Sequence, residues 1–431
     1  MAEATYKDRI VDSLIKEKLE AKGALLIRGP KWCGKTTTSE QFSKSVIYMN
    51  QIGKMTSNIE LAKIDPQFLL TGLTPRLIDE WQIAPELWDA IRFEIDHRRE
   101  PGQFILTGSA VPLKSEARNK IFHSGTGRFG IIDMLPMTLF ESGESTGEVS
   151  LEYLFSGPEV IRGINKLSLS DIAFITCRGG WPYALNTKLS KKAALSQARD
   201  YVDLVVEEDI SRVDNTNRNA ERARAIMRSY ARLQGTQTSV GLIRQDVAAN
   251  DSAGLSDDTI SSYLTALREI FVIKDLMSWN PNLLSKAAIR TTPTRYFSDP
   301  SIAAASLRFG PQDLINNLVS FGHIFETLCI RDLRVYTESL DGDLYHYRDS
   351  NGLECDAVVH LRNGKYGLIE IKLGGERLIE EGAANLIKFE KIIDTKKMGA
   401  PSFKMILTAV GDFAYRRKDG IYLVPIGCLK N

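Results

Sequence analysis

Eight consecutive residues, Gly29-Pro30-Lys31-Trp32-Cys33-Gly34-Lys35-Thr36, have the spacing G-x-x-x-x-G-K-[ST] of a phosphate-binding P-loop. An apolar run at 24–27 precedes them and a helix-compatible segment at 37–45 follows, which is the strand, loop, helix order of this motif. The glycines let the backbone wrap a phosphate closely, and the N–H groups at the helix start favour an anion. We expect Lys35 to reach the β- and γ-phosphates of a nucleotide and Thr36 to bind Mg²⁺. The predicted cofactor-binding residues of this loop are Gly29, Pro30, Lys31, Trp32, Cys33, Gly34, Lys35, Thr36 and Thr37.

A pair of acids, Asp79 and Glu80, ends the next informative apolar segment, which has the form of a Walker B strand. Because strand ends lie beside the phosphate loop in such a fold, we expect Asp79 to bind Mg²⁺ and Glu80 to act as general base on the attacking water. Solvated acids at a strand end are the competing interpretation. The strand predicted at 104–109 places Thr107 or Ser109 near the nucleotide, although a helix cap at Ser109 fits equally well.

Arg128 lies on a glycine-containing loop, 124–129, before a further predicted strand. An arginine there can act as a finger, in cis or across a subunit boundary, by stabilising charge on the transferring phosphoryl group. A surface arginine, or one paired with an acid at a strand end, explains the same residue.

The C-terminal third carries a second group of acids. Asp356 starts the middle strand of three predicted strands, and Glu370-Ile371-Lys372 ends the third, so that Glu370 and Lys372 share one face. This arrangement resembles the PD-(D/E)xK nuclease core, although Cys355 stands where that pattern has proline. The resemblance implies that Asp356 and Glu370 hold Mg²⁺ with Glu326 from the preceding helix, and that Lys372 stabilises charge. An ion pair on a surface hairpin is the alternative.

Composition limits the remaining possibilities. The chain has 431 residues, 43% of them apolar and 25% charged, which is typical of a soluble globular protein with two to four domains. A net charge of +1 indicates no global affinity for nucleic acid. The five cysteines and five histidines are scattered, which argues for free thiols and against a zinc site. Without a membrane-length apolar run or a signal-peptide core, the sequence predicts a cytoplasmic protein with no membrane contact.

The middle of the chain is predicted to be mostly helical. Gly179-Gly180 interrupts the helical pattern of 161–214, and we interpret it as a structural turn. From 239 to 279 the pattern is helix, loop, a helix capped by Ser256, then a strand at 271–276, which is the outline of a winged helix. Because the exposed face of the capped helix is not basic, protein or intramolecular packing is favoured over DNA reading there.

The motifs at 29–36, 77–82, 104–109, 127–128 and 135–141 occur in the order seen in prokaryotic AAA-type ATP-binding proteins related to the archaeal ATPases, which this chain therefore resembles. The resemblance implies ATP and Mg²⁺ as cofactors, and a C-terminal nuclease-like domain accompanies the ATPase domain in that family.

The predicted fold is an α/β multidomain protein. Its parts are a P-loop NTPase domain with a parallel sheet (1–141), a helical lid or linker (142–235), a winged-helix-like domain (236–292) and a restriction-endonuclease-like α/β domain (293–431). We expect ATP hydrolysis coupled to a nuclease-like effector that acts on or binds nucleic acid. The alternatives are an ATP-driven switch whose last domain only binds protein or nucleic acid, and a scaffold with negligible turnover. A homo-oligomer and a protein partner are both compatible with the sequence.

Overall fold

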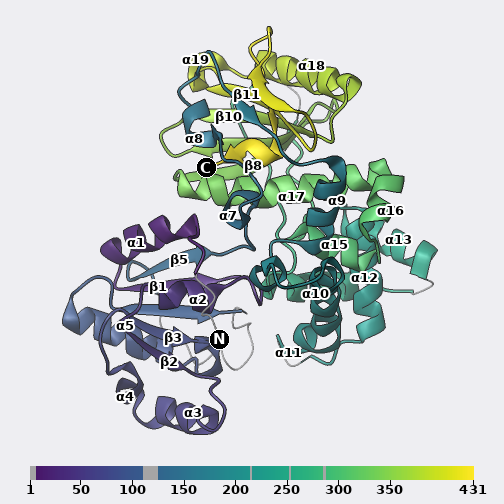
Figure 1. Cartoon of the computed structure of the whole chain (residues 1–431). Coiled ribbons are helices and arrows are strands. Elements are labelled where there is room, and N and C mark those ends of the chain that lie inside the picture. Colours follow the sequence, from purple (N-terminus) through teal and green to yellow (C-terminus); the bar gives the residue numbers. More distant parts are fainter. Residues whose placement is uncertain (1–5, 110–124, 214–215, 252–253, 285–287) are drawn as a thin grey trace.

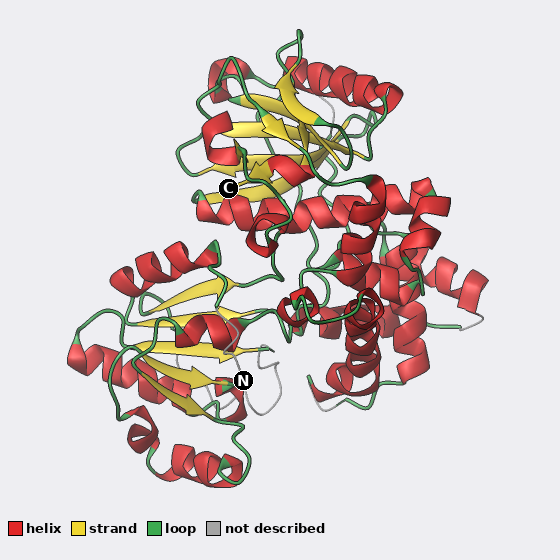
Figure 2. Cartoon of the chain, viewed as in Figure 1, coloured by secondary structure: helices red, strands yellow, loops and turns green. Residues whose placement is uncertain are grey.

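The chain divides into an N-terminal α/β part, a helical middle part and a C-terminal α/β part (Figure 1). The computed structural model describes residues 6–109, 125–213, 216–251, 254–284 and 288–431. Figure 2 shows the strands gathered in two separate groups, with the middle helices beside both.

The N-terminal part contains a parallel sheet of five strands in the order β2-β3-β4-β1-β5. The predicted parallel sheet is therefore confirmed. Because all strands run in one direction, their carboxyl ends meet at one edge of the sheet. Strand β4 lies between β1, which leads into the P-loop, and β3, which ends in Asp79. The strands are β1 (Ala24–Arg28), β2 (Ser45–Tyr48), β3 (Arg76–Asp79), β4 (Phe104–Gly108) and β5 (Phe129–Asp133).

Alternating side chains of β1 pack on opposite faces of this sheet. Ala24 and Leu26 join a cluster with helices α3, α4 and α5, whereas Leu25 and Ile27 join a cluster with α1. Both faces of the sheet are therefore covered, as expected for parallel strands. The helices are α1 (Val11–Ala21), α2 (Lys35–Glu40), α3 (Met55–Ile64), α4 (Pro66–Leu70) and α5 (Leu87–Arg98), of which α3 and α4 have no counterpart in the sequence analysis.

The middle part consists of helices that begin at polar capping residues. Ser168, Ser190, Asn219 and Ser256 each accept a hydrogen bond from a backbone N–H in the first turn of the helix that follows. The helices are α9 (Leu169–Arg178), α10 (Lys191–Leu204), α11 (Ile210–Arg212), α12 (Ala220–Arg232), α13 (Val240–Asp251), α14 (Asp257–Glu269) and α15 (Pro300–Ser306). A π-helical turn at Val205–Asp209 joins α10 to α11.

Only part of the winged-helix prediction appears in the structure. The two predicted helices are present as α13 and α14, including the Ser256 cap. The strand predicted at 271–276 is absent, because this described segment makes only isolated antiparallel bridges, Ile273 to Phe297 and Leu276 to Thr294. The structure thus shows a helical pair with a short bridged loop.

The C-terminal part is a seven-stranded mixed sheet in the order β7-β12-β13-β11-β10-β9-β8. Helix α17 packs on the face that carries Ile369 and Met405, and α18 packs on the opposite face, which carries Leu368 and Ile406. The main elements are α16 (Pro311–Asn316), α17 (Leu318–Ser339), β8 (Gly342–Arg348), β9 (Glu354–Leu361), β10 (Tyr366–Lys372), α18 (Glu376–Ile392), α19 (Thr395–Met398), β11 (Phe403–Thr408), β12 (Phe413–Arg416) and β13 (Tyr422–Pro425). The three strands predicted around Asp356 and Glu370, and the helix before them, are confirmed.

The segment after the N-terminal part crosses directly to the C-terminal sheet. β6 (Val149–Ser150) pairs with β14 (Leu429–Lys430), and β7 (Gly163–Ile164) pairs with β12. Helix α7 (Leu139–Ser142) ends the N-terminal part, and α8 (Leu151–Leu154) lies along this crossing. The region predicted as a lid at 142–235 therefore also contributes strands to the C-terminal part.

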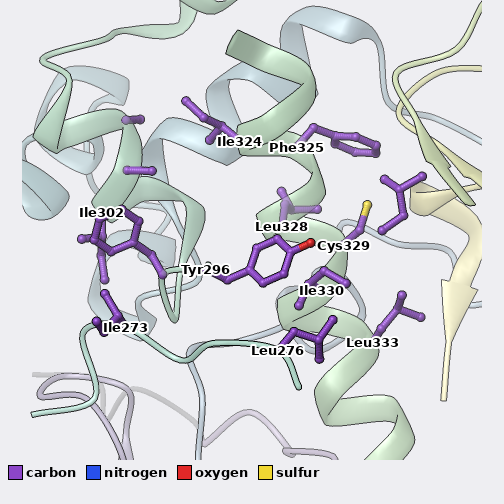
Figure 3. Packing of buried hydrophobic residues seen from close by; sticks show 14 of the residues in the cluster. Ile273, Leu276, Tyr296, Ile302, Ile324, Phe325, Leu328, Cys329, Ile330 and Leu333 are labelled. Atoms are coloured by element: carbon purple, nitrogen blue, oxygen red, sulfur yellow. The ribbon is translucent and has the colours of Figure 1, made fainter. Parts of the chain in front are cut away.

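The middle and C-terminal parts share one hydrophobic core, whereas the N-terminal sheet has its own two clusters. Helix α17 lies at the centre of the shared core: Phe325, Leu328 and Leu333 pack with Tyr296 and Ile273 from the middle part (Figure 3). The two parts thus depend on each other for burial of α17.

A charged triad is buried where the three parts meet. Arg331 on α17 lies 2.9 Å from Asp299 and 2.7 Å from Asp332, and the exposed fraction of each side chain is 1% or less. Asp332 accepts a hydrogen bond from the Leu139 N–H of the N-terminal part, and Asp299 accepts one from the Gly180 N–H. Burial raises the pKa of Asp332 to about 6, although the Arg331 guanidinium opposes that shift.

We predict that Arg331→Ala lowers the free energy of unfolding by about 3–5 kcal/mol, because it leaves two buried carboxylates without their cation. Urea denaturation followed by circular dichroism measures this loss. Arg377→Ala is the matched control, since its pair with Glu381 is exposed and is worth about 0–1 kcal/mol. An Arg331→Ala protein as stable as the control would contradict the role assigned to the triad.

Candidate functional site

The P-loop follows β1 and leads into the amino end of α2. Gly29 and Gly34 adopt φ of 156° and 101°, and a Cβ at Gly29 would lie 2.1 Å from the Met134 carbonyl oxygen, so glycine is required there. Lys35 is buried at the first position of α2, and its ammonium donates hydrogen bonds to the carbonyls of Gly29 and Pro30 at 2.9 and 2.8 Å. The loop therefore curls around the lysine that is predicted to hold phosphate.

The side chains predicted to bind Mg²⁺ meet at the carboxyl edge of the sheet. Thr36 Oγ1 donates to Asp79 Oδ1 at 2.7 Å, and Thr107 Oγ1 donates to the same oxygen at 2.6 Å. A hydroxyl and a carboxylate at this separation, next to a helix N-terminus and a buried lysine, fit the oxygen ligands of a nucleotide-bound Mg²⁺. Thr107 thus lies at the site, where it orients Asp79.

Glu80 is held in one orientation by its neighbours. Its backbone has φ of 56° and ψ of 45°, an uncommon conformation for a residue other than glycine. Its carboxylate accepts hydrogen bonds from the Gln82 amide and, at 3.4 Å, from Ser109 Oγ. Glu80 N–H also lies 3.4 Å from Thr107 Oγ1. Gln82 and Ser109 therefore position the predicted base, and a role for Ser109 on Glu80 was not foreseen from the sequence.

Two buried side chains that the sequence analysis did not select hold the outer side of the P-loop. Arg9 donates to the Cys33 carbonyl at 3.0 Å and to the Leu135 carbonyl at 2.9 Å, and forms an ion pair with Glu141 at 2.9 Å. Glu141 and Thr138 form a capping box at the start of α7. The T-x-x-E spacing of 138–141 was a visible signal for this cap, but it does not reveal the partner Arg9.

The side chains inside the P-loop turn towards the middle part. Lys31 Nζ lies 2.5 Å from Asp209 Oδ1, and the Trp32 and Tyr201 ring centroids are 6.3 Å apart. Cys33 is buried, with Sγ 3.5 Å from the Met134 carbonyl oxygen, and Thr37 is exposed on α2. Lys31 and Trp32 thus contact the middle part, and the contribution of residues 30–33 to nucleotide binding stays a prediction.

Arg128 does not join this site. It precedes β5, whose first residue, Phe129, pairs with Ala24 at the amino edge of the sheet, while the P-loop follows the carboxyl edge. Its guanidinium pairs with Asp96 at 2.6 Å. The strand direction thus places Arg128 away from Lys35, which does not fit an arginine finger acting within its own chain.

The predicted acids of the C-terminal sheet do come together. Lys372 Nζ lies 2.7 Å from Glu370 Oε2 and 3.2 Å from Asp356 Oδ2. Asp356 also accepts a hydrogen bond from the Ile371 N–H at 2.7 Å, and Asn385 on α18 donates to Glu370 Oε1 at 2.6 Å. Asn385 was not selected from the sequence. We call Glu326, Asp356, Glu370 and Lys372 the C-terminal cluster.

Burial perturbs the acids of the C-terminal cluster. Burial, followed by the Asp356 charge, raises the pKa of Glu370 to about 8. The same causes raise the pKa of Glu326 well above its usual range, and the Tyr296 hydroxyl, which donates to Glu326, opposes the shift. Burial opposes the charge of Lys372, but the two carboxylates outweigh it and raise its pKa. Perturbed groups of this kind are enriched at functional sites.

The C-terminal cluster is not arranged as a metal centre. Among the described residues, no group of three or more His, Cys, Asp or Glu side chains could hold a metal ion. The Lys372 ammonium lies within reach of both Asp356 and Glu370, the carboxylates that were predicted to bind Mg²⁺. The cluster as it stands is therefore an ion-paired network. In the same described part of the chain, no helix has the length and apolar character needed to span a membrane.

Comparison with known proteins agrees with the N-terminal geometry. Residues 21–142 match the family described as AAA domain, whereas 169–313 and 321–429 match two domains of unknown function, DUF8612 and DUF4143. The uncharacterized proteins Rv2008c of Mycobacterium tuberculosis and Mb2031c of Mycobacterium bovis are each 23% identical over 364 residues, covering 83% of this chain and 72% of theirs.

Among solved structures, the Walker-type ATPase PABY2304 of Pyrococcus abyssi covers 70% of this chain and 96% of its own, at 15% identity and a TM-score of 0.42. That score is too low to support an argument about this chain. The AAA match coincides with the five-stranded sheet and the P-loop described above. Residues 21–142 thus match the AAA domain family, and the N-terminal part has the parallel sheet and phosphate loop of a P-loop fold.

Proposed function

We propose that this protein binds and hydrolyses ATP at its AAA domain. The observation that carries the proposal is the 2.7 Å contact between Thr36 Oγ1 and Asp79 Oδ1, next to the buried Lys35 at the start of α2. A threonine, an aspartate and a lysine in this relation are the parts that P-loop NTPases use to hold Mg²⁺ and the β- and γ-phosphates.

Each of these side chains has a separate task in the proposed reaction. Lys35 and the N–H groups of the loop neutralise phosphate charge, and Thr36 and Asp79 hold Mg²⁺, which supplies electrostatic stabilisation of the phosphates when bound. Glu80 accepts the proton of the attacking water, while Gln82 and Ser109 keep its carboxylate at the carboxyl edge of the sheet.

We predict that Glu80→Gln lowers kcat for ATP hydrolysis by about 10²–10⁴-fold while leaving the Kd for ATP nearly unchanged, because only the proton acceptor is removed. Lys35→Ala is expected to abolish ATP binding. Phosphate release and fluorescent nucleotide titration measure the two effects. Glu100→Gln is the control, since Glu100 is exposed outside the site. An unchanged kcat in the Glu80→Gln protein would show that Glu80 is not the general base.

The C-terminal cluster supports a second candidate activity, cleavage of nucleic acid. Support comes from the convergence of Asp356 and Glu370 on Lys372 and from the raised pKa of Glu370, since these residue types and positions resemble the PD-(D/E)xK pattern. The ion-paired state of the cluster favours the alternative, in which the domain binds a partner without cleaving. In that case the protein is an ATP-driven switch.

Cleavage assays distinguish these two functions. If the cluster is a nuclease, the wild-type chain supplied with Mg²⁺ or Mn²⁺ cleaves at least one of linear DNA, circular DNA, single-stranded DNA and RNA, with or without ATP, whereas the switch predicts no cleavage. The double variant Glu370→Ala, Lys372→Ala loses this cleavage but retains ATP hydrolysis. Lys388→Ala is the control, because Lys388 is exposed on α18 outside the cluster. If the wild-type chain hydrolyses ATP but cleaves none of these substrates, the nuclease hypothesis is wrong, and the ATP-driven switch with a binding domain is the remaining function.

The same assay has an expected pH dependence. Because the pKa of Glu370 is raised to about 8, its carboxyl is mostly protonated below that pH and gains its charge as the pH rises through it. We predict that cleavage at subsaturating divalent cation increases between about pH 7 and pH 9, because the cation binds the ionised carboxylate. A rate that is constant over this range would show that ionisation of Glu370 does not control the reaction.

A further inference from the structure

A cavity of about 420 Å³ opens among four helices of the middle part, away from both sites described above. Its walls come from α9, α10, α12 and the end of α15 with the residues that follow, which lie together in Figure 1. None of its lining residues belongs to the P-loop or to the C-terminal cluster. The cavity is therefore a separate feature, and its volume lies within the range of small-molecule sites, about 300–1,000 Å³.

The floor of the cavity is apolar. Ala198 and Val202 from α10, Met227 from α12 and Cys177 from α9 line it, and each of them is buried. Burial also raises the pKa of the Cys177 thiol to about 12, so this side chain is neutral. A ligand that fills the floor must therefore present an apolar or aromatic surface.

Arginines line the rim of the cavity. They are Arg199, Arg224, Arg228 and Arg308, against one lining acid, Asp203. Three acids outside the lining pair with two of these arginines, Glu207 and Glu221 with Arg224 and Asp251 with Arg228, so the local count is four positive and four negative groups. The rim as a whole thus has no excess positive charge, and the charge available to a ligand is that of Arg199 and Arg308.

The four arginines differ in how they are held. Arg224 pairs with Asp203 and Glu207, and Arg228 pairs with Asp251, so these two guanidinium groups are fixed. In the described part of the chain, the exposed side chains of Arg199 and Arg308 form no ion pair or hydrogen bond. Arg308 also adopts φ of 59°, a backbone conformation that is uncommon for arginine. Two guanidinium groups with unused donors thus lie at a concave apolar surface.

We propose that this cavity binds a small organic phosphate, a phosphate monoester carried by an apolar or aromatic group of nucleoside size. A phosphate dianion matches the planar donor pairs of several guanidinium groups, which bind such oxygens in a bidentate manner. The apolar floor then holds the rest of the molecule. Inorganic phosphate has the same charge but leaves the floor uncovered, so that the two ligands are distinguishable by affinity.

The cavity shares a helix with the surroundings of the P-loop. Helix α10 supplies Ala198 and Val202 to the cavity, and Tyr201 of the same helix contacts Trp32 of the P-loop. The π-helical turn that continues α10 carries Asp209, the partner of Lys31. A ligand in the cavity therefore contacts the same helix that braces the P-loop, although its binding does not depend on the proposed ATPase activity.

Isothermal titration calorimetry tests the proposal. The full chain carrying Lys35→Ala, which removes phosphate binding at the P-loop, and the wild-type chain are each titrated with the four nucleoside 5′-monophosphates, the corresponding nucleosides and inorganic phosphate. At least one monophosphate is expected to bind both proteins with one site per chain. The matching nucleoside and inorganic phosphate are expected to bind at least about tenfold more weakly, since each lacks one half of the contacts.

Variants of the unpaired arginines identify the site. Arg199→Ala with Arg308→Ala is expected to raise the Kd for the monophosphate at least about tenfold, and the corresponding lysine pair is expected to give a smaller loss, because lysine keeps the charge without the planar donors. Arg162→Ala with Arg222→Ala is the control, since both side chains are exposed and Arg222 lies on α12 outside the cavity.

Three results would overturn the proposal. The first is no binding of any monophosphate to either protein. The second is equal affinity for the monophosphate in the alanine pair and in the control pair. The third is binding that disappears with Lys35→Ala alone, which would place the ligand at the P-loop.

Discussion

The desolvated triad of Asp299, Arg331 and Asp332 constrains how the rest of the chain is assembled. Arg331 and Asp332 come from α17 and Asp299 from the start of α15, and each acid also accepts a backbone N–H from a further segment, Leu139 or Gly180. A buried charge without its partner is strongly unfavourable, so these segments can meet only in the arrangement that satisfies all the groups at once. The triad thus favours one position of the N-terminal part relative to the shared core. This specificity does not depend on how much the triad adds to the free energy of unfolding.

That placement brings the helical middle part against the phosphate loop. The loop is tied on one side by Arg9, through the Cys33 carbonyl, and on the other by Asp209 and Tyr201, through Lys31 and Trp32. Lys35 meanwhile donates to carbonyls of its own loop. The proposed phosphate binding requires at least some of these donors to be redirected, and Lys31 and Trp32 are the contacts through which such a change would reach the middle part.

Local patterns in the sequence were sufficient for the strands, the P-loop and the meeting of Thr36 with Asp79, because each depends on neighbouring residues and on the direction of parallel strands. Arg9 was missed because Glu141 and Leu135 lie more than a hundred residues away, and Arg331 was missed because its partner Asp299 lies on another element. For Arg128 the sequence left a finger in cis, a finger in trans and a paired surface arginine open, although the rule that a residue before a parallel strand lies at the amino edge argues against the finger in cis. The strand at 271–276 failed because β-propensity needs a partner strand, and only isolated bridges are present in that described segment.

A chain of contacts through the middle part also connects the P-loop site with the C-terminal cluster. Asp133, at the end of β5, lies 2.6 Å from Arg28 beside the P-loop and 2.7 Å from Lys274, and these cations hold its pKa at about 2 against the effect of burial. Lys274 N–H donates to the Tyr296 carbonyl at 2.9 Å, and the Tyr296 hydroxyl donates to Glu326 of the C-terminal cluster. Continuity of contacts is a condition for coupling, but coupling itself requires an element with two arrangements. Of these links, the ion pair of Asp133 with Arg28 lies directly beside the P-loop, so the end of β5 is the first place to look for such an element.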